Sequence, residues 1–459
     1  MRMYCYLLSV GVPKPTIITT IILVCTIWFC TADAGILSLP KNYTGIHSAE
    51  EQVCVVEHGQ MVAVNVDSFG ALGDGYSDDT QAFVSAWKTA CSIPNSVFLV
   101  PEEKSYLVKP YKFRGPCQDG GIVIHIAGTL MAPDDPTTWD PHSPRNWLVF
   151  SDLNGATIQG GGIIDGSGHN WWAQSCKINK TNPCRSAPTA LTIDSSLNVR
   201  ITNLRFQNSQ QMHIVIARCT GVEVSDLQVV APQNSPNTDG IHITSSQNVL
   251  VERCSIATGD DCISIVTGSG NIKITEVLCG PGHGISIGSL GKDKSVGYVS
   301  GIMVEETTLT GTTNGLRIKT WQGGSGFVHG IRFQNILMNS VANPIIINQF
   351  YCDSSTPCEN QTSAVRVSEV IYENVKGTST TQHAMQFACS DSIACENIIL
   401  SNVDIRRESG DSADLLCNNA IGYGLGYINP SADCLLSHQT QDDQHVHSIL
   451  DCSALSCFL

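Results

Sequence analysis

The chain is dominated by short runs in which apolar residues, many of them β-branched, alternate with polar residues. Several runs share one form, an Asn or Gly followed by three residues of which the first and third are apolar, and they lie at 198–201, 221–224, 248–251, 271–274, 301–304, 330–333 and 397–400. From Val199 to Ile331 the corresponding apolar residues are 23, 27, 23, 30 and 29 residues apart. A repeat of this length is typical of a solenoid, and period-two alternation broken by Gly, Asn, Asp and Ser is typical of β-strands.

No long helical pattern separates these strands, which argues against a doubly wound α/β sheet. The pattern therefore predicts an all-β fold, a single-stranded right-handed parallel β-helix over residues 61–408 whose core is stacked Ile, Val and Leu. Segment 78–91 is the exception, because an Asp pair precedes apolar residues at helical spacing. We expect an N-terminal capping helix there, since the open end of a solenoid must be covered.

The N-terminus reads as a secretory signal peptide over residues 1–34. Residues 16–31 are uncharged and largely apolar, and Ala32-Asp33-Ala34 offers a small-x-small cleavage site. The alternative is an uncleaved membrane anchor, but a span needs about 20 apolar residues and this stretch is shorter and rich in Thr. We expect a secreted, extracellular protein with a leader at 35–60 and a disulfide-tied tail at 409–459.

Twenty cysteines fit a secreted chain, because an oxidising compartment favours disulfides. The pairs expected from proximity are Cys176–Cys184, Cys262–Cys279, Cys352–Cys358, Cys389–Cys395, Cys417–Cys434 and Cys452–Cys457. Zinc is the rival explanation, but no CxxC pair or suitable His spacing accompanies these cysteines, so we expect no metal and no cofactor. Three glycosylation sequons begin at Asn42, Asn179 and Asn360.

Polar side chains recur at one point of consecutive repeats, directly before an alternating strand. They are Asp239, the pair Asp260 and Asp261, and His283, and a fourth copy carries Arg317 and Lys319. Neighbouring strands of a sheet lie about 4.8 Å apart, so stacking the copies would bring Asp239, Asp261 and His283 within about 10 Å. That is the size of an active site.

Paired carboxylates are the groups that glycoside hydrolysis requires, one to protonate the leaving oxygen and one to activate water or attack. Asx-rich turns that merely end strands are the alternative for any single copy. His283 could tune a proton donor one coil away. Arg317 and Lys319 alternate with apolar residues and should point outward, where they would offer positive charge to an anionic substrate.

Four motifs, NTDG at 237–240, GDD at 259–261, GHG at 282–284 and RIK at 317–319, occur complete and in order. In these motifs the chain resembles the plant-type polygalacturonases over roughly residues 60–435. The resemblance implies inverting hydrolysis of α-1,4 bonds in de-esterified pectin. It implies Asp260 as general acid, Asp239 and Asp261 holding the attacking water, and His283 supporting the acid. It also implies that Arg317, Lys319 and Tyr351 bind the sugar and that Asn237 lines the site.

The net charge of −15 argues against nucleic acid as a partner, although it would also repel a polyanionic polysaccharide at long range. We expect pectin as the partner, a cell-wall location, no membrane association after signal removal, and a monomer. Endo action is favoured over exo action. Two rival functions are a pectate lyase, which would use Ca²⁺ and an arginine base, and a non-catalytic pectin-binding wall protein.

Overall fold

The computed structural model describes residues 54–56, 61–118, 121–140, 145–354 and 356–435. The predicted signal peptide, the leader apart from 54–56, and the Cys452–Cys457 pair lie outside these residues. In the part of the chain that the model describes, no helix is long and apolar enough to cross a membrane.

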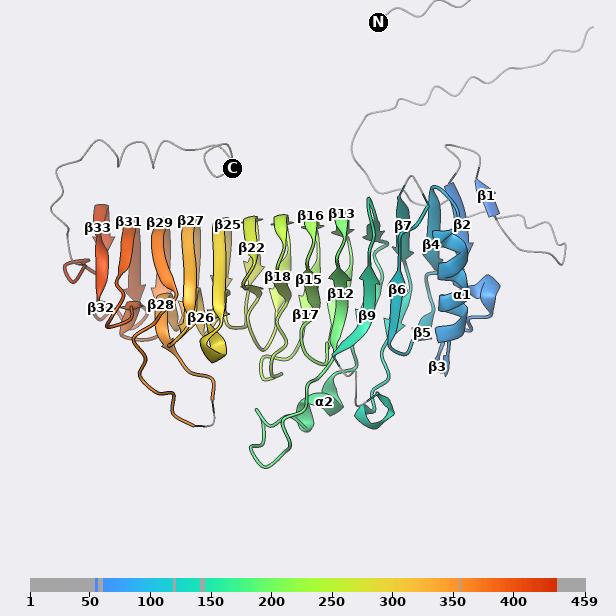
Figure 1. The fold of residues 1–459 in the computed structure, drawn as a ribbon, viewed down its shortest axis with the longest axis horizontal. Coiled ribbons are helices and arrows are strands. Elements are labelled where there is room, and N and C mark those ends of the chain that lie inside the picture. The colour runs from blue at the N-terminus through green and yellow to red at the C-terminus, as the bar shows by residue number, and fades with distance from the viewer. Residues whose placement is uncertain (1–53, 57–60, 119–120, 141–144, 355, 436–459) are drawn as a thin grey trace, which may run out of the picture. The chain divides into compact units, whose positions relative to one another are not determined.

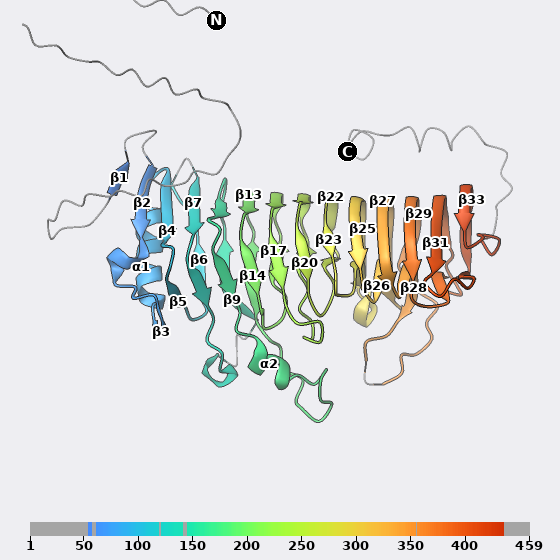
Figure 2. The ribbon, with the colours of Figure 1, turned by 180° about the vertical axis from the view of Figure 1, so that it is seen from behind.

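The described chain coils through three stacks of parallel strands (Figures 1 and 2). The first stack consists of β2 (Met61–Asn65), β4 (Ser96–Val100), β7 (Ile122–Ile126), β10 (Thr157–Gln159), β13 (Leu197–Thr202), β16 (Thr220–Ser225), β19 (Gln247–Glu252), β22 (Ser269–Thr275), β25 (Val296–Thr310), β27 (Ser325–Val341), β29 (Arg366–Ser379), β31 (Cys395–Arg407) and β33 (Ala420–Asn429). The second stack consists of β3 (Asp74–Asp78), β5 (Ser105–Leu107), β8 (Thr129–Met131), β11 (Ile163–Asp165), β14 (Arg205–Gln207), β17 (Gln228–Val230), β20 (Ser255–Ala257) and β23 (Leu278–Cys279).

The third stack carries the predicted site. It consists of β6 (Tyr111–Arg114), β9 (Asn146–Ser151), β12 (Thr189–Asp194), β15 (Ile214–Ala217), β18 (Ile241–Thr244), β21 (Ile263–Ile265), β24 (Ile285–Leu290), β26 (Asn314–Trp321), β28 (Asn343–Tyr351), β30 (His383–Ala388) and β32 (Asp414–Asn418). Short helices η1 (Val66–Phe69), α2 (His169–Ala173), η2 (Pro136–Thr138) and η3 (Lys292–Lys294) lie in the connections. The predicted parallel β-helix is therefore present.

The register agrees with the repeat read from the sequence. Val199 pairs with Val222, and the pairing continues through Val249 and Ile272 to Ile302 and Ile331. These side chains are at most 2% exposed and form part of one continuous core. From β25 onward the first two stacks merge into one long strand per coil, because β25 pairs with both β22 and β23.

The Asn or Gly that precedes each of these core residues has a backbone requirement. All of them adopt positive φ, from 51° at Asn198 to 71° at Gly221, with Asn248 at 56°. Asn and Gly enter this left-handed region more readily than other residues, and a β-branched side chain is excluded from it by its own bulk. The repeated Asn or Gly thus marks the bend at which each coil enters the first stack.

Helix α1 (Thr80–Cys91) occupies the predicted capping segment and packs on the first coils (Figure 1). Trp87 lies edge-on to Phe98, Phe113 and Phe150, with ring centroids 5.4–5.7 Å apart. Asp79, one of the Asp pair before the helix, occupies the N-cap position but makes no side-chain cap. The Asp79 carboxylate instead accepts the backbone N–H groups of Leu72 and Gly73, at 2.7 and 3.2 Å, and so holds the preceding turn.

Strands continue past residue 408, the predicted end of the β-helix. β33 pairs in parallel with β31, and Ile398 lies opposite Gly422. A Cβ at Gly422 would lie 2.0 Å from the Ile398 carbonyl oxygen, so this strand requires Gly where earlier coils carry Ile or Val. The Gly-rich sequence hid the strand from a pattern based on β-branched residues.

Six disulfides join described cysteines, and five of them were expected: Cys176–Cys184, Cys262–Cys279, Cys352–Cys358, Cys389–Cys395 and Cys417–Cys434. The sixth, Cys91–Cys117, joins the end of α1 to the loop after β6, and its 26-residue separation gave no proximity signal. Among the described residues, Cys219 and Cys254 are buried free thiols.

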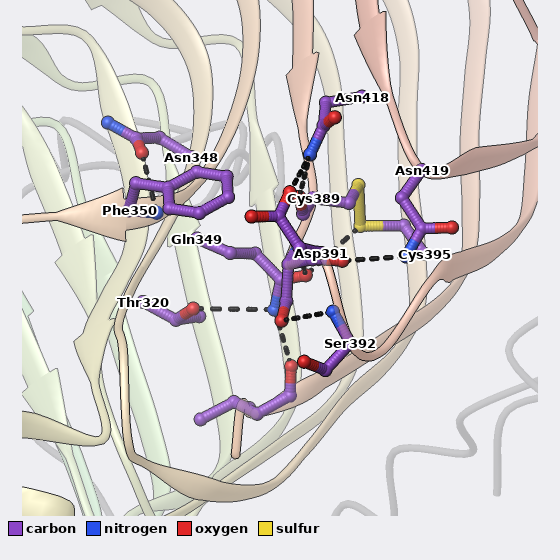
Figure 3. The surroundings of a disulfide bond; sticks show 12 residues. Thr320, Asn348, Gln349, Phe350, Cys389, Asp391, Ser392, Cys395, Asn418 and Asn419 are labelled. Carbon is purple, nitrogen blue, oxygen red and sulfur yellow. Dashed lines mark hydrogen bonds between the residues drawn. A yellow bond between two sulfur atoms is a disulfide. The ribbon is translucent and has the colours of Figure 1, made fainter. Parts of the chain in front are cut away.

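The Cys389–Cys395 loop lies against β28 (Figure 3). The buried side chain of Gln349 donates to the Val365 carbonyl at 2.6 Å and accepts the Ser390 N–H at 3.0 Å. Asn419 donates to the Ser390 carbonyl at 2.6 Å. This network fixes the strand that ends in Tyr351.

The positive-φ bend gives a test of what stabilises each coil. Replacing Asn248 with Val should lower the free energy of unfolding by about 1–2 kcal/mol, because a β-branched residue is strained at φ 56°. The midpoint of urea unfolding measures the change. Asn248→Gly is the matched control, because it keeps the bend relaxed and removes only the exposed hydrogen bond from Asn271. If Gly destabilised as much as Val, the side-chain bond would matter more than the backbone.

Candidate active site

The strands of the third stack bring the predicted site residues together. Ile241, Ile263, Ile285 and Leu316 lie in register and point into the core. Since Ile241, Ile263 and Ile285 sit two positions after Asp239, Asp261 and His283, these three stand in register at the entrance of consecutive strands. They line one open cleft of about 500 Å³, together with Asn237, Asp260, Arg317, Lys319 and Tyr351.

Asp260 and Asp261 both line this cleft although they are neighbours in sequence. They occupy the bend before β21 rather than the strand itself, so the alternation of a strand does not separate them. The Asp261 N–H donates to Asp260 Oδ1 at 2.8 Å, and His283 Nδ1 lies 3.1 Å from the same oxygen. Asn237 donates to the other oxygen, Oδ2, at 3.3 Å. His283 thus contacts Asp260 and not the in-register Asp261.

The next outward positions form a second set, His242, Ser264, Ser286 and Arg317, on adjacent strands. Ser264 donates to Asp239 Oδ2 at 2.7 Å, and its oxygen lies 2.7 Å from His242 Nδ1. Ser286 donates to Asp261 Oδ1 at 2.8 Å and accepts from Arg317 Nε at 2.9 Å. Asp239 and Asp261 thus each accept a hydrogen bond from a serine. Of these two serines, only Ser286 also contacts a cationic side chain, that of Arg317.

Arg317 and Lys319 are less exposed than the alternation predicted. Arg317 lies 2.6 Å from Asp261 Oδ1 and Lys319 lies 2.7 Å from Asp261 Oδ2, and both side chains are largely buried. The Lys319 ammonium is also 5.5 Å from the centre of the Tyr351 ring. Both cationic side chains therefore form ion pairs with Asp261 and also line the cleft.

This asymmetry drives the pKa values of the two carboxyls apart. Burial and the charges of Asp260 and Asp261 raise the pKa of Asp239 well above its ordinary value. Burial alone would also raise the pKa of Asp261, but the charges of Lys319 and Arg317 outweigh it, and the pKa of Asp261 is lowered. When the pKa values of two carboxyl groups differ, one site can contain a protonated and an ionised carboxyl group at the same pH.

Two histidines support the site, His213, which is fully buried, and His242, which is half-buried at the wall of the cleft. His213 donates its backbone N–H to the Asp239 carbonyl at 2.8 Å, and its Nδ1 lies 3.1 Å from the same oxygen. Burial lowers the pKa of His213 and of His242 to about 4. Both rings are therefore neutral near neutral pH, and they orient Asp239 without adding charge.

Sequence reasoning named the carboxylates but missed Ser264, Ser286, His242 and His213. The first three were within reach, because each occupies the outward position of the alternating strand that comes after a motif. His213 had no such signal, since it precedes β15 without any motif of its own.

A cation could in principle bridge Asp260, Asp261 and His283, whose ligand atoms all lie within 4.8 Å of one another. Both oxygens of Asp261 already accept bonds from Arg317 or Lys319, however, and Asp260 Oδ1 already faces His283. An ion would have to displace these partners, so the donor set is a poor match for a resident metal.

Several carboxyl groups around an open cleft are typical of an enzyme that cleaves glycosidic bonds. The chain belongs to the glycosyl hydrolases family 28, whose model matches residues 91–423. It is 49% identical over 358 residues to a polygalacturonase of Persea americana, covering 78% of this chain and 77% of that protein. It is 48% identical over 387 residues to a probable polygalacturonase of Arabidopsis thaliana, covering 84% and 87%.

Solved structures share the fold. A Thermotoga maritima exopolygalacturonase matches with a TM-score of 0.66 at 20% identity, covering 83% of this chain and 94% of that one. An endo-xylogalacturonan hydrolase of Aspergillus tubingensis matches with a TM-score of 0.68 at 24% identity, covering 79% and 100%. These matches agree with the predicted right-handed parallel β-helix.

The opposite pKa shifts predict opposite effects of two matched substitutions on stability. The raised folded pKa of Asp239 means that its favourable contribution is present below the unfolded pKa of about 3.9 and is lost as pH rises through the folded pKa. Asp239→Asn should therefore unfold at a higher temperature than the wild type at pH 7, with the gain vanishing toward pH 4. Thermal unfolding across this pH range measures it.

Asp261→Asn is the counterpart. The lowered folded pKa of Asp261 means that its contribution is present above the unfolded pKa and is lost only as pH falls through the folded value. Removing this charge leaves Arg317 and Lys319 buried beside a neutral group, which should cost about 3–5 kcal/mol at pH 7. Equal destabilisation by the two substitutions would contradict this account of the cluster.

Proposed function

We propose that the chain is a secreted polygalacturonase that hydrolyses α-1,4 bonds between galacturonate units of de-esterified pectin, with endo action. The observation that carries the proposal is that Asp239, Asp260 and Asp261 line one cleft, in which Arg317 and Lys319 form ion pairs with Asp261. The polygalacturonases to which the chain is similar over most of its length support the substrate class.

Asp260 is proposed as the general acid. Its side chain is 17% exposed, whereas that of Asp261 is 2% exposed, so Asp260 is the better placed of the pair to reach a glycosidic oxygen. The bonds from the Asp261 N–H and Asn237 fix its orientation. His283 Nδ1 lies 3.1 Å from Asp260 Oδ1, and His283 is proposed to support Asp260 in this role.

Asp239 and Asp261 are proposed to hold the attacking water on the opposite side of the sugar. The pKa of Asp239 is raised in the free protein and that of Asp261 is lowered, and the role proposed for Asp239 requires its carboxylate form. Three interacting carboxyls titrate as a unit, and the acid limb of the activity profile belongs to the cluster. Arg317, Lys319 and Tyr351 are proposed to bind the sugar beside the cleaved bond.

Endo action is supported by the surface beyond Asn237. A second cavity of about 570 Å³, lined by Pro136, Trp139, Trp171 and Arg185, lies on that side. A smaller cavity shares Trp171 and Arg185 with it and Pro236 and Asn237 with the central cleft. Continuous binding surface on one side of the bond gives room for further sugar units of a polymer.

The first test is the reaction itself. Purified protein without residues 1–34 should release reducing ends from polygalacturonate, and full activity should survive a strong chelator. The products should lack the ultraviolet absorbance of an unsaturated uronate. Activity that a chelator abolishes and Ca²⁺ restores, with absorbing products, would identify a lyase instead.

The second test addresses the acid. Asp260→Asn should lower turnover at least about 100-fold, which is the lower end of the loss when a general acid or base is removed. The wild type should release the β-anomer first, as NMR can follow, because an inverting enzyme changes the anomeric configuration. Asp226→Asn is the matched control, since Asp226 pairs with Arg253 outside the cleft. Near-normal turnover in Asp260→Asn would show that another carboxyl is the acid.

A further inference from the structure

An ion pair joins two loops that are far apart along the coil. Lys177 Nζ lies 2.5 Å from Asp353 Oδ1, although 176 residues separate them. Lys177 follows α2 in the loop that the Cys176–Cys184 disulfide closes, and Asp353 follows β28 and the half-cystine Cys352. Both loops extend on the same side of the coil (Figures 1 and 2).

The strands beneath this pair are those of the active site. The loop of Lys177 leads into β12, and in the third stack β12 and β28 are separated by β15, β18, β21, β24 and β26. Six strand spacings amount to about 29 Å, so the two loops reach toward each other across the catalytic strands. Lys177 and Asp353 both line the cleft that holds Asp239, Asp260 and Asp261. We call this contact the Lys177–Asp353 bridge.

The bridge is built to open. Its two side chains are 45% and 48% exposed, and ion pairs with that much water contact are weak and easily screened by salt. Each loop is held by its own disulfide, so the bridge is not needed to keep either loop closed on itself. Breaking the bridge should therefore leave the conformation of both loops unchanged.

Lys177 is also the accessible cation of the cleft. Of the Lys and Arg side chains that line it in the described chain, Arg317 and Lys319 are committed to Asp261 and are 13% and 9% exposed. Lys177 is bound instead by an exposed carboxylate of the protein, the same chemical group that each unit of polygalacturonate carries. A substrate carboxylate can therefore replace Asp353 without leaving a buried charge unpaired.

We infer that Lys177 binds a galacturonate carboxylate and that Asp353 occupies Lys177 in the free enzyme, so that substrate entering the cleft exchanges one carboxylate for another. This inference rests on the proposed function. Asp353 then acts as a built-in competitor that lowers affinity for the polyanion, and Lys177 determines specificity at a point away from the reacting bond.

The two ends of the bridge should have opposite effects on KM for polygalacturonate. Lys177→Met should raise KM about tenfold, since a charge-assisted bond to the substrate is lost. Asp353→Asn should lower KM about twofold to fivefold, because the competitor is neutralised while Lys177 remains. The kcat of both variants should stay within about twofold of the wild type, because neither side chain contacts the carboxylates that perform the reaction.

The controls separate charge from loop structure. Lys177→Arg should keep a KM near that of the wild type, and Lys177→Gln should behave like Lys177→Met. Glu223→Gln, which breaks a comparable exposed pair with Arg200 in the first stack, should leave KM unchanged. Raising the salt concentration should shrink the difference between Asp353→Asn and the wild type.

An equal rise of KM in Lys177→Met and Asp353→Asn would show that the bridge only holds the loops in place. An unchanged KM in Lys177→Met, whatever Asp353→Asn does, would remove Lys177 from the binding surface. Failure of the proposed function is distinguishable from both results, because the wild type itself would then release no reducing ends from polygalacturonate.

Discussion

The structure depends on one constraint, the parallel register that places equivalent residues of successive coils in contact. Adjacent parallel strands lie about 4.8 Å apart, so each inward-pointing residue lies next to the equivalent residue of the following coil. The Ile or Val of one coil therefore packs on the Ile or Val of the next. The same register repeats the outward positions, which is why polar residues from segments more than 20 residues apart in sequence meet in one cleft. The same repeat therefore positions the inward residues of the core and the outward residues of the active site.

The sequence sufficed where the register alone decides the outcome. The steps from Val199 to Ile331 predicted the pairing residue by residue, and the four motifs predicted which side chains would gather. It failed where a side chain chooses among neighbours at similar distances. His283 contacts Asp260 and not Asp261, and Lys319 turns to Asp261 and not to open water, because local charge and burial, not the period, settle these contacts.

Other failures share a different cause, the absence of a local signal. Cys91 and Cys117 approach only because α1 folds over the first coil. Strand β33 lacks β-branched alternation because its close approach to Ile398 requires Gly422. The opposite pKa shifts of Asp239 and Asp261 could not be predicted from the sequence either, since both residues precede similar strands. They arise because burial and the neighbouring carboxylates raise the pKa of Asp239, whereas Lys319 and Arg317 contact Asp261 directly and lower its pKa.

The first strand of the coil has a consequence for the protein's behaviour at high concentration. A stack of parallel strands ends in unpaired backbone groups, and these could receive the last coil of a second molecule as readily as another coil of the same chain. Here β1 (Cys54–Val56) pairs antiparallel with β2 and α1 packs beside it. The reversed strand direction interrupts the parallel ladder at this end, so the terminal coil is a poor template for end-to-end polymerisation into fibres.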